Sequence, residues 1–214
     1  MAYVAFLNTK GGSGKSTLAT NLVTWLARSD GGIALVDYDP QESAMAWLRR
    51  RPKGLPSIHG VSGKTNEIRN VRLYRLTEGL GVRNVVIDTP AAIPPTQLIY
   101  FCRDADKLIV PVTPSQIDID VCARLIRNLH VYGGVKRGDG RVAVVANRVR
   151  RETIAFRQLE RFLAVLEIPL VATIRDSQVY VACAAGGLGI ADLPDAARQR
   201  EELAWSGLID WIRR

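Results

Sequence analysis

Cysteine is scarce in this chain: Cys102, Cys122 and Cys183 are the only three among 214 residues, and no two of them form a CxxC pair. Such a set favours neither a disulfide framework nor a zinc site. Long apolar runs are also missing, since no stretch approaches the roughly 20 apolar residues of a membrane span. No basic segment precedes the apolar start of the chain, as it would in an export signal. We therefore expect a protein of the reducing cytoplasm that is neither exported nor membrane-spanning.

Acidic side chains are in deficit: 21 Asp and Glu stand against 29 Lys and Arg, which gives a formal charge of +8. This excess favours polyanionic partners such as nucleic acids, because their phosphates release counterions on binding. The basic residues are spread over both halves of the chain, so simple solubility remains an alternative. The composition, with 47% hydrophobic residues, is that of a globular protein, and we expect residues 1–214 to form a single domain.

Short apolar runs alternate with helical patterns from end to end. The pattern predicts strands at 3–7, 33–36, 85–87, 108–112, 142–146 and 171–174. It predicts helices at 15–28, 41–50, 64–77, 95–104, 116–131, 152–166, 177–185 and 195–213. Such alternation indicates an α/β fold of three layers, a mostly parallel twisted sheet flanked by helices on both faces. Residues 51–63, rich in glycine and proline, are predicted to be the most irregular loop.

The stretch TKGGSGKST at residues 9–17 lies between the first predicted strand and the first predicted helix. It matches the phosphate-loop pattern G-x-x-x-x-G-K-[ST], except that Thr9 replaces the first glycine and a second lysine, Lys10, follows it. Glycines allow the backbone amides to surround phosphate at the positive end of the helix. The alternative is a glycine-rich turn without a ligand. The residues predicted to bind nucleotide here are Gly11, Gly12, Ser13, Gly14, Lys15, Ser16 and Thr17.

These side chains have distinct expected tasks. Lys15 would reach the β and γ phosphates, Ser16 would supply a hydroxyl to Mg²⁺, and Thr17 would contact the α phosphate. Together with the alternating pattern, the motif predicts a P-loop NTPase fold.

Three aspartates end predicted strands, where ligands gather in open α/β sheets. Asp88 in VVIDTPA ends one strand and is expected to serve the Mg²⁺ of the P-loop. Asp37 and Asp39 in LVDYDPQ end another. One of this pair would join the Mg²⁺ shell while the other orients the attacking water; the alternative is that they cap the helix after Pro40.

Three motifs carry a family resemblance. KGGSGKST, DYDPQ and IDTPA, in this order and spacing, resemble the deviant Walker A, A′ and Walker B motifs of the ParA/MinD family of P-loop ATPases. The resemblance covers nearly the whole chain. It implies that Lys10 is the family's signature lysine, which crosses the interface of an ATP-bound dimer to the partner's phosphates, as an arginine finger does. Hydrolysis would then be coupled to dimerisation.

The same resemblance implies further roles. Asp39 would hold the attacking water, Asp37 would contact the water shell of Mg²⁺, and Asp88 would be the Walker B aspartate. Asn147, at the end of VAVVAN, would read the adenine edge, although a polar residue there is also a common cap. The backbone near Arg175 and Asp176 would border the base.

Branches of the family differ in their partners. The last predicted helix is amphipathic with basic ends, so it could bind membrane as in MinD, but packing within the fold is the preferred explanation and membrane is not expected as a partner. Cys102 and Cys122 lack the glycine-rich surroundings of the cluster ligands in the related iron proteins, and buried thiols are expected instead. A metabolic P-loop ligase or kinase is a third possibility, for which no substrate motif is found.

The favoured interpretation is a small ParA-type ATPase with ATP and Mg²⁺ as cofactors. It would form an ATP-dependent homodimer, bind double-stranded DNA without sequence preference, and position a plasmid, chromosome region or protein cargo on the bacterial nucleoid. A ParB-like or adaptor protein would stimulate hydrolysis. The arginines expected to contribute to the DNA surface are Arg148, Arg150, Arg151, Arg157, Arg161 and Arg175.

Overall fold

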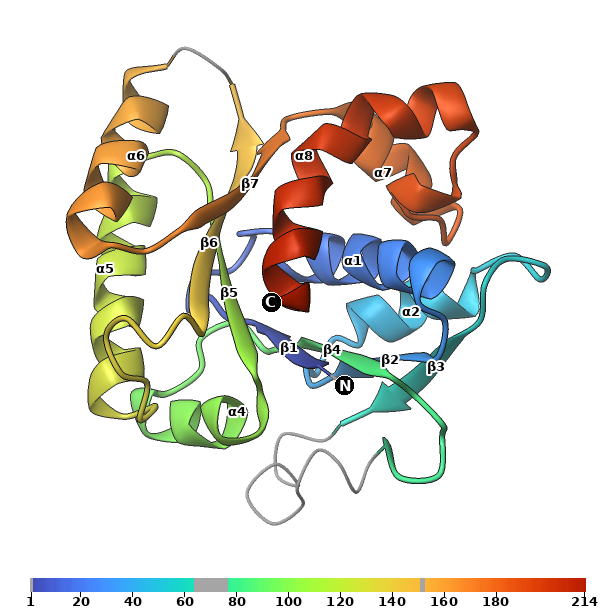
Figure 1. Cartoon of the computed structure of the whole chain (residues 1–214), viewed down its shortest axis with the longest axis horizontal. Helices are drawn as coiled ribbons and strands as arrows, with labels where there is room; N and C mark the ends of the chain where they lie inside the picture. The colour runs from blue at the N-terminus through green and yellow to red at the C-terminus, as the bar shows by residue number, and fades with distance from the viewer. Residues whose placement is uncertain (1, 64–76, 151–152) are drawn as a thin grey trace.

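The computed structural model describes residues 2–63, 77–150 and 153–214. In this part of the chain seven strands form one sheet in the order β3-β2-β4-β1-β5-β6-β7, and all neighbouring strands are parallel (Figure 1). The strands are β1 (Ala2–Phe6), β2 (Ile33–Asp37), β3 (Ile58–Ser62), β4 (Asn84–Asp88), β5 (Lys107–Val112), β6 (Val142–Val149) and β7 (Leu170–Arg175). The predicted α/β class with a parallel sheet is confirmed.

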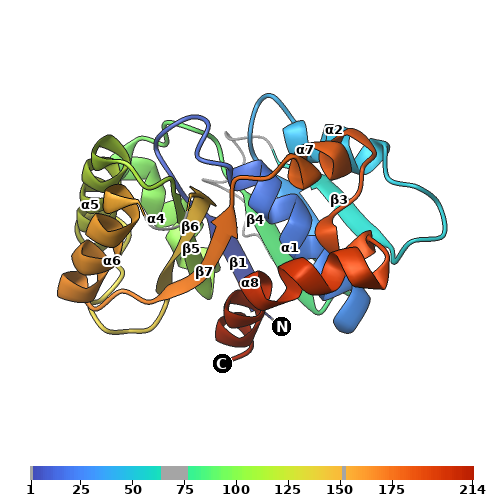
Figure 2. The ribbon, with the colours of Figure 1, turned by 90° about the horizontal axis from the view of Figure 1, so that it is seen from above.

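Helices cover both faces of this sheet, as the two views show (Figures 1 and 2). One face carries α1 (Lys15–Ser29), α2 (Ser43–Arg49), α7 (Gln178–Ala185) and α8 (Asp195–Arg213). The other carries α4 (Leu98–Asp104), α5 (Gln116–Val131) and α6 (Ile154–Leu166). Short 3-10 turns, η1 (Pro95–Gln97) and η2 (Ile190–Asp192), precede α4 and α8. The helix predicted at 64–77 falls almost wholly on residues 64–76, outside the described part.

Strand residues alternate between two hydrophobic cores. In β1, Val4 and Phe6 pack beneath α1 and α8, whereas Ala5 and the following Leu7 pack beneath α4 and α5. All four are fully buried. A strand buried on both faces has no polar side chain to alternate with, which explains why the sequence shows an unbroken apolar run.

The prediction for residues 51–63 was wrong in part, because this segment contains strand β3 at Ile58–Ser62. Among the described residues the strand lies at the edge of the sheet and pairs with β2 alone. Its apolar residues, Ile58 and Val61, are only half-buried, so no apolar run marks it. Gly60 is there for a packing reason, since a Cβ at this position would lie 2.5 Å from a methyl carbon of Leu48.

The last helix, α8, is part of the core. Its apolar side chains Trp205, Leu208, Trp211 and Ile212 are buried. Gly207 allows close packing on β7, because a Cβ there would lie 2.6 Å from the carbonyl oxygen of Val171. The apolar face that a membrane anchor would need is therefore used inside the molecule. Among the described residues, none of the helices combines the length and the apolar character needed to span a bilayer.

The cysteines are buried free thiols, as predicted for Cys102 and Cys122. Burial raises the pKa of each of these two thiols to about 12. They are therefore inert packing residues at neutral pH.

Candidate active site

The order of the strands brings the predicted motifs together. The chain leaves β1 into the glycine-rich loop, β4 lies beside β1, and β2 lies beside β4. Asp37 and Asp88 are paired in register at the carboxyl ends of β2 and β4. Two aspartates and the loop thus meet at one edge of the sheet, as expected for a ligand site in an α/β protein.

The loop itself has the conformation that its glycines allow. Gly12 and Gly14 have φ angles of +77° and +92°, in the left-handed region that favours glycine. Gly14 stands at the start of α1, where no described side chain caps the helix and no acidic residue occupies the first turn. The first amides of α1 are therefore left to bind an anion.

Lys15 points into the site from the first turn of α1. Its side-chain nitrogen donates to the carbonyl oxygen of Asn8 at 3.1 Å, and the residue is only 7% exposed. Burial lowers the pKa of this lysine, while the nearby carboxylates of Asp88 and Asp39 oppose the shift. A buried ammonium with no carboxylate bound directly to it among the described residues is suited to receive phosphate oxygens.

Asp88 is the most strongly perturbed acid of the site. It is fully buried, and neither carboxylate oxygen makes a hydrogen bond of ordinary geometry in the described part of the chain, although the Ser16 hydroxyl lies close enough to act on the carboxylate. Burial raises its pKa to about 7, although the Ser16 hydroxyl and the Lys15 ammonium partly offset this. Carboxylate oxygens without partners fit a hard cation such as Mg²⁺, which uses one or two carboxylates together with phosphate oxygens and water.

Asp37 has a structural task. Its carboxylate accepts backbone N–H groups from Asp39 at 2.9 Å, from Ala44 at 3.0 Å and from Met45 at 3.1 Å. The last two lie in the first turn of α2, so Asp37 caps this helix, which was the alternative left open by the sequence. Burial raises its pKa, and the three N–H groups oppose the rise.

Asp39 lies beyond the end of β2 and borders a cavity of about 560 Å³. One of its oxygens accepts the N–H of Gln41 at 2.9 Å. The predicted loop residues also border this cavity, namely Gly11, Gly12, Ser13, Gly14, Lys15, Ser16 and Thr17. The structure therefore brings Asp39 and residues 11–17 of the phosphate loop around one space.

Lys10 takes a different direction from Lys15. Its side-chain nitrogen contacts both carboxylate oxygens of Asp118, at 2.9 and 3.0 Å. Asp118 lies in the first turn of α5 and was not foreseen from the sequence. The two lysines of the loop thus serve different places, one inside the cavity and one beside it.

Asn147 lies against the loop, but its amide is already engaged. Its side-chain nitrogen donates to the carbonyl oxygen of Ser13 at 2.9 Å, and the residue is 5% exposed. The next residue, Arg148, borders the cavity and has a positive φ of 53°, which is uncommon for a residue other than glycine and concentrates at functional sites. Arg148 was predicted to contribute to a DNA surface, and no sequence motif indicates its place at the cavity.

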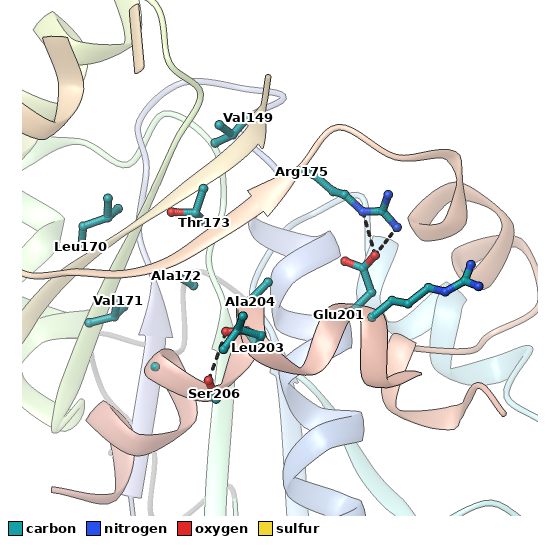
Figure 3. A pocket seen from close by; sticks show the side chains of 12 residues that line it. Val149, Leu170, Val171, Ala172, Thr173, Arg175, Glu201, Leu203, Ala204 and Ser206 are labelled. Atoms are coloured by element: carbon teal, nitrogen blue, oxygen red, sulfur yellow. Dashed lines mark hydrogen bonds and ion pairs between the residues drawn. The ribbon is translucent and has the colours of Figure 1, made fainter. Parts of the chain in front are cut away.

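Arg175 and Asp176 do not border the cavity of the phosphate loop. Arg175 lies at the end of β7 and forms an ion pair with Glu201 of α8, beside a separate cavity of about 850 Å³ (Figure 3). The backbone N–H of Asp176 donates to the carbonyl oxygen of Val149 at 3.2 Å. The predicted border of the base at these two residues thus remains a prediction.

Asn8 is a residue that the sequence analysis missed. It is buried, and its side chain accepts the backbone N–H of Lys10 at 2.8 Å and donates to the carbonyl oxygen of Pro111 at 2.6 Å. Its backbone carbonyl oxygen also accepts the side-chain nitrogen of Lys15. Because Pro111 lies in β5, this asparagine ties the loop to that strand. Its position between the first predicted strand and the P-loop is the feature of the sequence from which this role could have been predicted.

A match to a known family identifies the kind of protein that carries this site. Residues 4–188 match the model of the CobQ/CobB/MinD/ParA nucleotide binding domain. The chain belongs to this family. It is a P-loop ATPase of the ParA/MinD group, with ATP and Mg²⁺ as cofactors, and the uncapped α1, buried Lys15 and unpartnered Asp88 fit both ligands.

Individual relatives support the assignment. The chain is 38% identical to maintenance of carboxysome distribution protein A of Gloeobacter kilaueensis over 131 residues, which cover 59% of this chain and 55% of that protein. It is 30% identical to the chromosome-partitioning ATPase Soj of Thermus thermophilus over 183 residues, 73% of each. The fold is similar to apo McdA of Cyanothece, with a TM-score of 0.79 at 16% identity and 99% coverage of both chains.

Proposed function

We propose that this ATPase positions a cargo inside a bacterial cell by cycling on DNA. In the proposed cycle, residues 1–214 act as one domain, two copies close around ATP and Mg²⁺, and the dimer binds double-stranded DNA without reading its sequence. A ParB-like or adaptor protein then stimulates hydrolysis and releases the chain. The protein would accordingly be cytoplasmic and associated with the nucleoid.

One observation carries the proposal: a single loop presents two lysines, with Lys15 inside the cavity and Lys10 beside it. A second copy is the natural source of a phosphate for a lysine that faces out of its own site. In the proposed reaction Asp39 orients the attacking water, while Lys10 stabilises charge on the transferring phosphoryl group of the partner. Ser16 and Asp88 would hold Mg²⁺, with Asp37 near its water shell.

The relatives favour cargo positioning. Their names refer to carboxysome distribution and to chromosome partitioning. The alternative of a MinD-like membrane ATPase is less well supported, because α8, the segment that would form the anchor, buries most of its large apolar side chains, namely Trp205, Leu208, Trp211 and Ile212.

DNA binding is argued from charge. Arg157 and Arg161 are exposed on α6 and can approach phosphate freely. Arg150 is 81% exposed and lies 3.5 Å from Asp176, a weak surface pair. Arg151 lies outside the described residues. We propose that α6 and the end of β6 supply the DNA surface, and that Asn147, Arg175 and Asp176 lie toward the base in the bound state.

The switch can be tested by co-sedimentation with plasmid DNA in the presence of ATP or ADP. We expect retention with ATP only, because pairing doubles the basic surface, and a fall in log affinity of about 0.9 per log unit of salt for each phosphate neutralised.

Lys15→Ala should abolish nucleotide binding, whereas Asp39→Ala should trap the ATP dimer on DNA. Arg157→Ala combined with Arg161→Ala should abolish retention on DNA, and Arg28→Ala combined with Arg49→Ala, which also removes two exposed charges, is the matched control. Equal retention in ATP and ADP would refute the proposed switch.

A further inference from the structure

The ion pair between Lys10 and Asp118 is specific and well enclosed. Both distances from the lysine nitrogen, 2.9 and 3.0 Å, are those of charge-assisted hydrogen bonds. The side chain of Asp118 is only 7% exposed, whereas that of Lys10 is 43% exposed. The acid is thus a fixed part of the fold, and the lysine is the partner that can move.

Asp118 has support that does not depend on Lys10. The hydroxyl of Ser115, the N-cap of α5, donates to its carboxylate at 2.5 Å, and the same hydroxyl accepts the backbone N–H of Asp118 at 3.1 Å. The positive end of α5 also stabilises a negative charge in its first turn. The carboxylate therefore stays in place when the lysine leaves, because the Ser115 hydroxyl and the helix end still stabilise its charge.

The backbone at Lys10 is held as firmly. Its N–H donates to the side-chain oxygen of Asn8 at 2.8 Å, and the carbonyl oxygen of Thr9 accepts the N–H of Ala92 at 3.1 Å. A change in the direction of the lysine therefore needs only rotation of its side chain. The energetic cost of that rotation is the loss of the contacts to Asp118.

We propose that Asp118 is a positioning residue for Lys10, which holds its amino group against α5 in the single chain and gives it up only to the triphosphate of a second copy. This inference rests on the proposed role of Lys10. Because the lysine must exchange one anion for another, the contact with Asp118 adds a free-energy cost to closing the dimer. ATP bound in both copies offsets this cost, since a triphosphate carries more negative charge than a carboxylate and attracts the lysine more strongly.

Asp118→Asn tests the proposal. Asparagine keeps the size of the side chain and can still accept the Ser115 hydroxyl, but it attracts the lysine far less. Loss of one charge-assisted hydrogen bond changes an equilibrium constant by about 10-fold or more, and the exposure of Lys10 favours the low end of this range. Closing the dimer breaks this contact twice, once in each copy, so we expect the ATP-dependent dimer of Asp118→Asn to form with a dissociation constant about 100-fold lower, as measured by sedimentation equilibrium.

Asp120→Asn is the matched control, because Asp120 is exposed two residues further along the same helix and contacts only Gln116 within the described part. It removes the same charge and should leave the dissociation constant almost unchanged. Asp118→Glu should restore wild-type dimerisation, and Asp118→Asn combined with Lys10→Ala should behave as Lys10→Ala alone. If Asp118→Asn matches the control while Lys10→Ala prevents dimerisation, or if the two substitutions act additively, the proposal is wrong.

A second measurement separates this inference from the proposed function. The amino groups of the nucleotide-free protein are acylated with a water-soluble ester, and the modified lysines are quantified by mass spectrometry. Asp118→Asn should speed modification of Lys10 several-fold relative to exposed Lys53, and an unchanged ratio overturns the inference. If Lys10→Ala leaves ATP dimerisation intact, the proposed function fails in its central step even when the labelling result agrees. Asp118→Ser repeats both measurements should asparagine prevent folding.

Discussion

Replacement of Asp88 by asparagine should make the nucleotide-free protein more stable, although it removes an acid of the active site. The carboxyl group is fully buried without a hydrogen-bond partner in the described residues. Burial raises its pKa from 3.8 to about 7. The folded chain therefore retains a proton that the unfolded chain loses as the pH rises from about 4 to about 7, and the free energy of unfolding falls across that window.

The size of this effect follows from the shift in pKa. A difference of about 3 units at 1.36 kcal/mol per unit corresponds to about 4 kcal/mol above pH 7. This value is an upper limit, because asparagine leaves a buried amide without partners and removes the negative charge that faces Lys15. The expected gain for Asp88→Asn is thus about 1–4 kcal/mol at pH 8, declining toward zero near pH 4.

Urea unfolding of both proteins, without nucleotide or magnesium, at a series of pH values between 4 and 8 measures this gain. Asp120→Asn, which changes an exposed carboxylate, should show no such pH dependence. A variant that is less stable than the wild type at pH 8, or a difference that does not change with pH, would show that the carboxylate has a partner and that the reasoning fails. Addition of Mg²⁺ and ATP should stabilise the wild type more than the variant, by linkage.

Other substitutions give shorter tests. Gly14→Ala should weaken ATP binding at least 10-fold in calorimetry, because its Cβ would lie 2.2 Å from the side-chain nitrogen of Asn147 at a φ of +92°; wild-type affinity would contradict the tight packing of the loop. Asp37→Ala should lower the free energy of unfolding by about 1–3 kcal/mol through loss of the cap on α2, and a neutral result would mean that this cap is dispensable. Trp205→Ala should cost about 3–5 kcal/mol, whereas Leu203→Ala on the same helix should cost little, since Leu203 is 84% exposed; comparable losses would place α8 outside the core.

The sequence was sufficient for most of the fold because buried parallel strands and amphipathic helices have strong local patterns. The predicted helix at 195–213 matches α8 residue for residue. The apolar residues that give the sequence its helical spacing are the residues that this helix buries. Strand β3 was missed because an edge strand with one neighbour needs few apolar residues. Its glycine, which resembles a loop signal, is required by packing against α2.

The site was predictable to the extent that its chemistry is local. Gly14 and Lys15 act through the backbone turn and the helix that the motif itself encodes. The contact of Lys10 with Asp118 joins residues 108 positions apart, and only the neighbouring positions of β1 and β5 in the sheet bring them together. Asp37 could not be assigned from spacing, because a carboxylate at a strand end serves a helix cap and a metal equally well.

All four tryptophans of the chain belong to the hydrophobic core beneath α1 and α8, and none lies beneath α4, α5 and α6. Intrinsic fluorescence excited at the indole band is therefore a one-sided reporter, sensitive to solvent entering one layer of the molecule and blind to the other. Trp25 lies on α1, the helix that follows the P-loop, so an emission change on adding nucleotide would reflect a movement transmitted along that helix. A tryptophan introduced beneath α5 would supply the missing signal and reveal whether the two layers melt together.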